Sequence, residues 1–185
     1  VEAIQERGGK VVVVDPRLSR TAEQADQWVS IRPGTDALLL AAIANTMLAE
    51  GVADPGEHVA AHLSGLDALA AALEPFTAEF AAPVTGIDAA TIRSMARELA
   101  AAPSAAVYGR IGTTTTEFGS TASWLVDVVN ILSGNFTEVR VDDPTPLVTH
   151  TEYPSAAVRG DLVVVAYEKA KYDSSAAQGE DLAYV

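Results

Sequence analysis

The chain contains no cysteine among its 185 residues. It therefore cannot form a disulfide, hold an iron–sulfur cluster or bind a metal through thiolates. Basic residues are also few: 12 lysines and arginines accompany 25 acidic residues, and the net charge of -13 argues against binding to nucleic acid. No apolar run reaches the roughly twenty residues that a membrane helix needs. These absences favour a globular domain with neither thiol chemistry nor membrane insertion.

The first ten residues, VEAIQERGGK, lack the basic start and the apolar middle of a signal peptide. They resemble the last turns of a helix, with Gly8 and Gly9 as its cap. Because the chain opens inside an alternating pattern of helices and strands, we expect it to be a piece of a longer protein. We expect a cytoplasmic location, and export to the periplasm stays open because any export signal would lie upstream.

Val11 to Val14 are four consecutive β-branched residues, a pattern typical of a strand buried on both faces. Asp15 follows directly, Pro16 ends the strand, and Asp36 comes after a Pro-Gly turn further along. In doubly wound α/β folds, an acid at the carboxyl end of a strand often binds a ribose or a base. Asp is also common as a turn former or helix cap. If both acids bind one ligand, their carboxylates should approach each other across a crevice.

The other elements are predicted from apolar spacing and capping residues. Further strands are expected at Trp28–Ile31, Ala105–Tyr108 and Leu162–Ala166. Helices are expected over Asp36–Glu50, in two or three short pieces from Asp54 through Phe80, and over Ala89–Ala101 and Ser120–Leu132. The last two helices would turn inward Ile92, Met95, Ala96 and Leu99, and Trp124, Val128, Ile131 and Leu132, respectively. This order predicts an α/β fold: a Rossmann-like, mainly parallel sheet with helices on both faces.

Three blocks of the sequence, in order, resemble the molybdopterin oxidoreductases of the dimethyl sulfoxide reductase superfamily. The first, VVVVDPRLSRTAEQADQWVSIRPGTD, is similar to the family's DPR…AD…PGTD signature. The second runs from EHVAAHLSG to TGIDAATIRSMARELA, and the third is AAVYGRIGTTTTEFGSTASWLVDVVNILSGN. Together they cover most of residues 1–136. We expect residues 137–160 to be an irregular excursion and 161–185 to add a further strand and a tail to the same domain.

The resemblance implies that residues 1–136 bind the guanosine end of one molybdopterin guanine dinucleotide. The loop after the first strand would contact the ribose and phosphates through Asp15, Pro16, Arg17, Leu18 and Ser19. A second group would hold the guanine: Gly34, Thr35 and Asp36. The Asp36 carboxylate would accept hydrogen bonds from the base's N1–H and exocyclic amine, since two coplanar acceptors match two parallel donors. A third group would lie along the pterin: Ile111, Gly112 and Thr115.

In this family the domain is part of a molybdenum or tungsten enzyme that transfers an oxygen atom or abstracts hydride. The metal's side-chain ligand and any iron–sulfur cysteines would lie in segments absent here, so this chain alone would bind cofactor without catalysing. Its partners would be the remaining domains of the same enzyme and electron-transfer subunits. Two alternatives stay open. One is a catalytically silent structural relative, as in the iron–sulfur subunit of NADH dehydrogenase, and the other is a generic nucleotide-binding module.

Some polar residues have plainer interpretations. His58 and His62 are four apart, but Val59 replaces the acid of a zinc HExxH motif, so we interpret both histidines as exposed helix residues. The hydroxyls of 113–116 could cap a helix or meet a ligand. We interpret Asp26 as structural, holding the loop beside the second strand. Arg17, like its neighbour Arg20, could be a phosphate ligand or a solvated charge.

Overall fold

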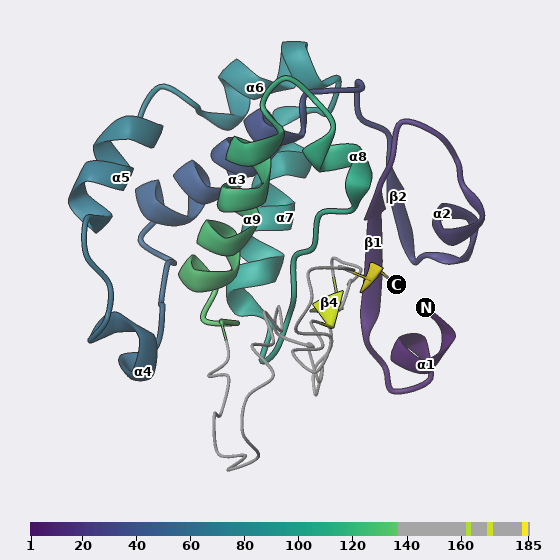
Figure 1. Cartoon of the computed structure of the whole chain (residues 1–185), viewed down its shortest axis with the longest axis horizontal. Coiled ribbons are helices and arrows are strands. Elements are labelled where there is room, and N and C mark those ends of the chain that lie inside the picture. The colour runs from purple at the N-terminus through teal and green to yellow at the C-terminus, as the bar shows by residue number, and fades with distance from the viewer. Residues whose placement is uncertain (137–161, 164–169, 172–182, 185) are drawn as a thin grey trace, which may run out of the picture.

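The computed structural model describes residues 1–136 and three short strands at 162–163, 170–171 and 183–184. A small parallel sheet lies along one side of the molecule, in the order β2 (Gln27–Val29), β1 (Lys10–Val14) and β3 (Leu162–Val163) (Figure 1). β4 (Ala170–Lys171) and β5 (Ala183–Tyr184) form a separate antiparallel pair. The architecture is mixed α/β and mostly helical.

Nine helices, connected by loops and turns, occur in the described part of the chain. They are α1 (Glu2–Gln5), α2 (Arg20–Gln24), α3 (Asp36–Ala49), α4 (Glu57–Ala60), α5 (Leu66–Leu73), α6 (Ala78–Thr85), α7 (Ala89–Ala101), α8 (Ile111–Thr114) and α9 (Gly119–Leu132).

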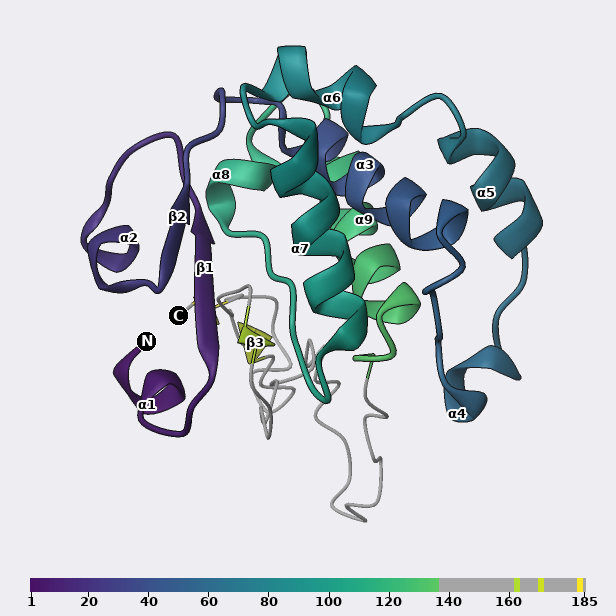
Figure 2. The same ribbon diagram turned by 180° about the vertical axis from the view of Figure 1, so that it is seen from behind.

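Helix α3 is the centre of the core. Its sequence DALLLAAIANTMLA is apolar on nearly every side, which is typical of a helix surrounded by protein. Figure 1 shows α9 in front of α3, and the reverse view in Figure 2 shows α7 in front of it. Met47 of α3, Ile92 of α7 and Leu132 of α9 are at most 1% exposed. The bundle of these helices is therefore the principal apolar core, and the sheet lies beside it.

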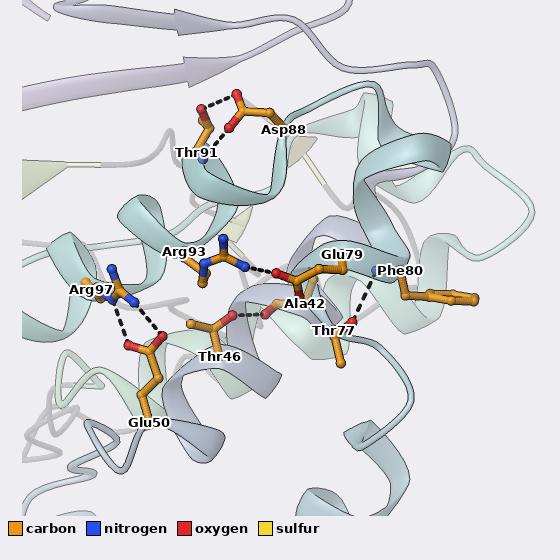
Figure 3. Close-up of polar contacts among 10 residues, drawn as sticks. All are labelled: Ala42, Thr46, Glu50, Thr77, Glu79, Phe80, Asp88, Thr91, Arg93 and Arg97. Atoms are coloured by element: carbon orange, nitrogen blue, oxygen red, sulfur yellow. Dashed lines mark hydrogen bonds and ion pairs between the residues drawn. The ribbon is translucent and has the colours of Figure 1, made fainter.

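Polar contacts fix the outer surface of this bundle (Figure 3). Arg97 of α7 makes two bonds to Glu50 at the end of α3, Nε–Oε2 at 2.7 Å and a second nitrogen to Oε1 at 2.8 Å. Arg93 pairs with Glu79 of α6. Each of these exposed pairs contributes little to stability, because water and salt screen the attraction between the charges. They fix the relative position of three helices whose buried faces supply the main stabilisation.

Several predicted elements are confirmed. α7 has the predicted bounds, and the Asp88 carboxylate caps it by accepting from the Thr91 N–H at 2.8 Å. α3 ends one residue before the predicted Glu50, and Gly51 follows with φ +66°, a left-handed conformation that favours glycine. β1 covers the predicted strand, and β3 pairs parallel with it over the two described residues of the predicted strand 162–166. Helix α2 was not predicted.

The predicted strand at Ala105–Tyr108 is wrong. Ala105, Ala106 and Val107 are buried, as expected, but none of the four residues joins a ladder with the described strands. The N–H groups of Ala105 and Val107 bond instead to side-chain amides of Asn135 and Asn130. The prediction that this segment is buried is confirmed, but the sequence pattern could not show what its backbone would pair with.

Two side chains also differ from expectation. Trp124 is 53% exposed rather than inward, because the buried stripe of α9 runs through Ala122, Leu125, Val128, Val129 and Leu132. His62 is exposed, as expected, but it lies beyond the end of α4 rather than on a helix shared with His58.

The expectations for residues 137–160, and for most of 161–185, fall outside the described residues. None of the helices in the described part of the chain combines the length and the apolar character required to span a bilayer.

Candidate functional site

The loop after β1 begins with a turn built by Asp15. Its Oδ1 accepts a hydrogen bond from the Arg17 N–H at 2.8 Å, and its carbonyl accepts one from the Trp28 indole N–H at 2.8 Å. Three residues after Asp15, exposed Leu18 leads to Ser19, whose hydroxyl caps α2. Asp15 is thus a turn former, as Asp residues often are. Its second carboxylate oxygen accepts no hydrogen bond from the described residues.

Asp26 secures the other end of β1. Its carboxylate accepts from the Val11 N–H at 2.7 Å, and its own N–H donates to the Val11 carbonyl at 3.0 Å. The bond from the Val11 backbone is the main reason why the pKa of Asp26 lies below its usual value. These contacts are consistent with the structural interpretation of Asp26.

An open cleft of about 710 Å³ lies where the loops after β1 and β2 meet the end of α6. This volume is in the range of ligand sites, about 300–1,000 Å³. Its lining residues are Pro16, Arg17, Ser30, Ile31, Arg32, Pro33, Thr85 and Gly86. Of the site residues predicted from the sequence, the cleft brings together Pro16 and Arg17.

The two arginines of the cleft differ in what they bind. Arg32 donates from its guanidinium to the carbonyls of Pro83 and, at 3.2 Å, of Val84, and its backbone N–H donates to Thr85 at 2.8 Å. It therefore holds the carboxyl end of α6 against the β2–α3 loop. Arg17 is exposed, and its guanidinium has no partner among the described residues. Arg17 is the cation of the cleft that is available for an anionic ligand.

The PGTD turn continues directly from the cleft into α3. Gly34 has φ +81°, which a residue with a Cβ rarely adopts, and the Thr35 hydroxyl donates to the Arg32 carbonyl at 2.7 Å. Asp36 is the first residue of α3 and is half-buried. Burial raises its pKa above the usual value, because no side chain of the described residues compensates its charge. Gly34, Thr35 and Asp36 adjoin the cleft through Pro33 but do not line it.

The third predicted group lies on and beside α8. Ile111 is 75% exposed, and a Cβ at Gly112 would meet nothing within 4 Å. The Thr115 hydroxyl donates to the Ile111 carbonyl at 2.9 Å, and the neighbouring threonines 113, 114 and 116 donate to backbone carbonyls in the same way. The hydroxyl hydrogens of these threonines are thus used to stabilise the turn, and their hydroxyl oxygens stay available to accept hydrogen bonds. This group does not line the cleft.

Sequence reasoning missed most of the cleft. Ser30 and Arg32 stand just before the PGTD motif, and Pro33 is its first residue, so their proximity in the chain was a usable signal. Thr85 and Gly86 were part of the TGI block, but nothing in the sequence placed that block beside the β1 loop. No three His, Cys, Asp or Glu side chains gather as a metal site within the described part of the chain.

The half-buried carboxylate of Asp36 predicts a pH effect on stability. Because its pKa is raised in the folded state, stability falls as the pH rises from the ordinary Asp value of about 3.9 through the raised value. Asp36→Asn should therefore raise the melting temperature of the ligand-free protein at pH 7. The gain should disappear below about pH 3.9, where the carboxyl is protonated in both states. Thermal unfolding measured against pH checks this.

Asp88→Asn is the matched control with the opposite sign. Bonds from the hydroxyl and N–H of Thr91 lower the pKa of Asp88, so its contribution to stability is present at neutral pH and is lost on acidification. The control variant should melt lower than the parent at pH 7. An Asp36→Asn protein that also melts lower would show that the carboxylate has a stabilising partner.

Comparison with known proteins identifies the family. The chain matches the family described as molybdopterin oxidoreductase over residues 2–176. The chain belongs to this family. The resemblance found in the three sequence blocks is thereby confirmed, and with it an association with oxidoreductases and with molybdopterin.

The relatives of this molybdopterin oxidoreductase domain have several substrates. The molybdopterin-containing subunit of thiosulfate reductase from Salmonella typhimurium is 37% identical over 132 residues, 71% of this chain and 17% of the relative. The corresponding subunit of arsenate respiratory reductase from Shewanella sp. is 34% identical over 191 aligned residues, covering 89% of this chain and 22% of the relative. Formate dehydrogenase H from Escherichia coli is 34% identical over 107 residues, covering 58% of this chain and 15% of the relative.

A solved structure agrees with the fold. Acetylene hydratase from Pelobacter acetylenicus matches 74% of this chain with a TM-score of 0.68 and 30% identity, and the match covers 19% of that protein. The chain therefore spans about a fifth of the length of its relatives. One neighbour is a hydratase by name, so family membership alone does not fix the reaction.

Proposed function

We propose that this domain binds the guanosine end of a molybdopterin guanine dinucleotide within a molybdenum or tungsten oxidoreductase. In this proposal the small parallel sheet belongs to a Rossmann-like domain with helices on both faces. Ligands of such folds bind outside the carboxyl ends of the strands. The cleft lined by the loops after β1 and β2 lies at those ends.

The observation that carries the proposal is the exposed Arg17 at this cleft. Every other cleft residue is apolar, uncharged or, for Arg32, bonded to carbonyls of α6. A guanidinium that has no partner among the described residues suits a phosphate, because its planar donors match the phosphate oxygens. In a chain with net charge -13, an exposed arginine in a cleft is a specific local feature rather than part of a basic surface.

Asp36 would supply base recognition. Its carboxylate is half-buried and has no side-chain partner in the described part of the chain, so it lowers the stability of the empty protein. Such a destabilising residue is expected where a protein keeps a side chain for ligand binding. Its two oxygens could accept from the N1–H and the exocyclic amine of guanine. Asp15, with one carboxylate oxygen available, would contact the ribose. That Asp15 and Asp36 face each other across one crevice remains a prediction.

The residues of this chain would position the cofactor rather than carry out chemistry. The metal, when bound at the pterin end, supplies oxygen-atom or hydride transfer. Its side-chain ligand, and any iron–sulfur cluster, would belong to other parts of the enzyme. Those parts and electron-transfer subunits would be the partners of this domain.

Arg17→Gln tests the phosphate contact. In the intact protein freed of cofactor, the variant should bind guanosine diphosphate about tenfold more weakly, which corresponds to about 1.4 kcal/mol for one exposed charge-assisted hydrogen-bond pair. Binding of guanosine, which has no phosphate, should be unchanged. Titration calorimetry with both ligands measures the difference.

Arg20→Gln is the matched control, because Arg20 is also exposed and lies three residues away on α2 but does not line the cleft. It should leave both affinities as they are. Equal weakening by the two variants would mean that only general charge attracts the phosphate. Equal affinity of the parent protein for adenosine and guanosine diphosphates would favour a generic nucleotide-binding module, and no binding at all would favour the structural relative.

A further inference from the structure

The side chain of Asn130 on α9 holds the peptide groups of Val107. Its Oδ1 accepts from the Val107 N–H at 2.8 Å, and its Nδ2 donates to the Val107 carbonyl at 2.8 Å. The same Nδ2 donates to the Val126 carbonyl at 3.0 Å within the helix. Both donors and the acceptor of this amide are therefore in use, which gives the side chain one defined orientation.

A second amide continues this contact two residues earlier. The Asn135 Oδ1 accepts from the Ala105 N–H at 2.6 Å, while its Nδ2 donates to the carbonyl and hydroxyl of Ser133. In an extended chain, the N–H groups of residues two apart point to the same side. Asn130 and Asn135 thus replace the edge of a neighbouring strand for residues 105–107.

The turn that follows residues 105–107 is tightly built. A Cβ on Gly109 would lie 2.5 Å from the Thr113 hydroxyl oxygen, so the chain passes close to α8 as it turns. Ile111 follows on this turn, and its side chain is exposed to solvent. The residues predicted to meet the pterin therefore depend for their position on a segment held by two asparagine amides rather than by a strand ladder.

We infer that Asn130 is a positioning residue for cofactor binding: its amide fixes the Val107 peptide and thereby aims the turn Gly109–Gly112 at the pterin end of the cofactor. The inference rests on the proposed function, because it takes this turn as part of the cofactor site. Asn130 acts at a distance, through the backbone, and it does not belong to the cleft around Arg17. Its loss should affect one end of the cofactor more than the other.

Asn130→Leu in the intact protein tests this assignment. Leucine has a similar size but no hydrogen-bonding group, so both bonds to Val107 are lost. Amide hydrogen exchange in peptides covering 105–112 should become about tenfold faster, which corresponds to a loss of about 1.4 kcal/mol of local stability when the two bonds are removed. Release of pterin from the loaded protein, followed by fluorescence, should accelerate by a similar factor. Affinity for guanosine diphosphate should stay unchanged.

Asn45→Leu is the matched control. Asn45 is also a half-buried helical asparagine whose Nδ2 donates to a backbone carbonyl, that of Leu73 at 3.0 Å, away from the turn. It should change neither exchange in 105–112 nor pterin release. If Asn130→Leu does not fold, Asn130→Ala provides the same measurements without added bulk near Val107.

Three outcomes would overturn the assignment. Unchanged exchange in 105–112 would mean that the amide does not hold the segment. Faster exchange with pterin release equal to that of Asn45→Leu would remove the link to the cofactor. An equal loss of guanosine diphosphate affinity would indicate a general structural effect. Failure of the proposed function is a separate result, because the parent protein would then bind neither guanosine diphosphate nor pterin, whatever the exchange data show.

Discussion

Asp36→Ala is expected to weaken binding of a guanine nucleotide by about 30- to 1000-fold, or roughly 2–4 kcal/mol. The half-buried carboxylate is the acceptor that we assign to two donors of the base. Removing it leaves both donors without partners in a site from which water is partly excluded, and unpaired groups in such sites carry a large penalty. In the intact enzyme, molybdenum and pterin content per protein should fall, and activity should fall in proportion.

Inosine diphosphate provides the sharpest control for this prediction, because inosine lacks the exocyclic amine of guanosine but keeps N1–H. The parent protein should prefer guanosine diphosphate over inosine diphosphate, and the preference should largely vanish in Asp36→Ala. A variant that keeps this preference would show that another group recognises the amine. A variant that keeps full metal and pterin content but loses turnover would place Asp36 in a role other than guanine binding.

Helices were predictable from the sequence because capping and apolar spacing are local properties. Asp88 and the spacing of Ile92, Met95 and Leu99 gave the bounds and the buried face of α7. α3 was predicted for the same reasons, although its all-round burial depends on its neighbours.

The non-local features were harder to predict. The segment 105–108 has the composition of a buried strand, but whether it pairs with a strand or with side-chain amides depends on residues 130 and 135. In α9, two apolar stripes share Val128 and Leu132, and the large Trp124 favoured the wrong one. The contribution of Thr85 and Gly86 to the cleft is a property of tertiary packing, which no local pattern contains.

Gly119→Ala is expected to destabilise the protein by about 3 kcal/mol, the upper range for forcing extra volume into a packed site. Gly119 is buried at the start of α9, and a Cβ there would lie 2.1 Å from the Thr114 carbonyl oxygen and 2.5 Å from its carbon. Backbone atoms cannot rotate away as a side chain can, so the α8–α9 turn must shift. For a chain of this size, about 3 kcal/mol corresponds to a melting temperature lower by roughly 6–12 °C.

Gly112→Ala is the matched control, since it makes the same substitution in α8, where a Cβ would meet nothing within 4 Å. Alanine is favoured over glycine inside helices by about 0.5–1 kcal/mol, so this variant should be as stable as the parent or slightly more stable. Without the clash with Thr114, alanine would be favoured at position 119 in the same way. The sign of the change in melting temperature therefore isolates the steric effect. Should Gly119→Ala melt at or above the parent temperature, the close passage of α8 against the start of α9 is incorrect. The exposed position of Ile111 on this turn would then lose its structural basis.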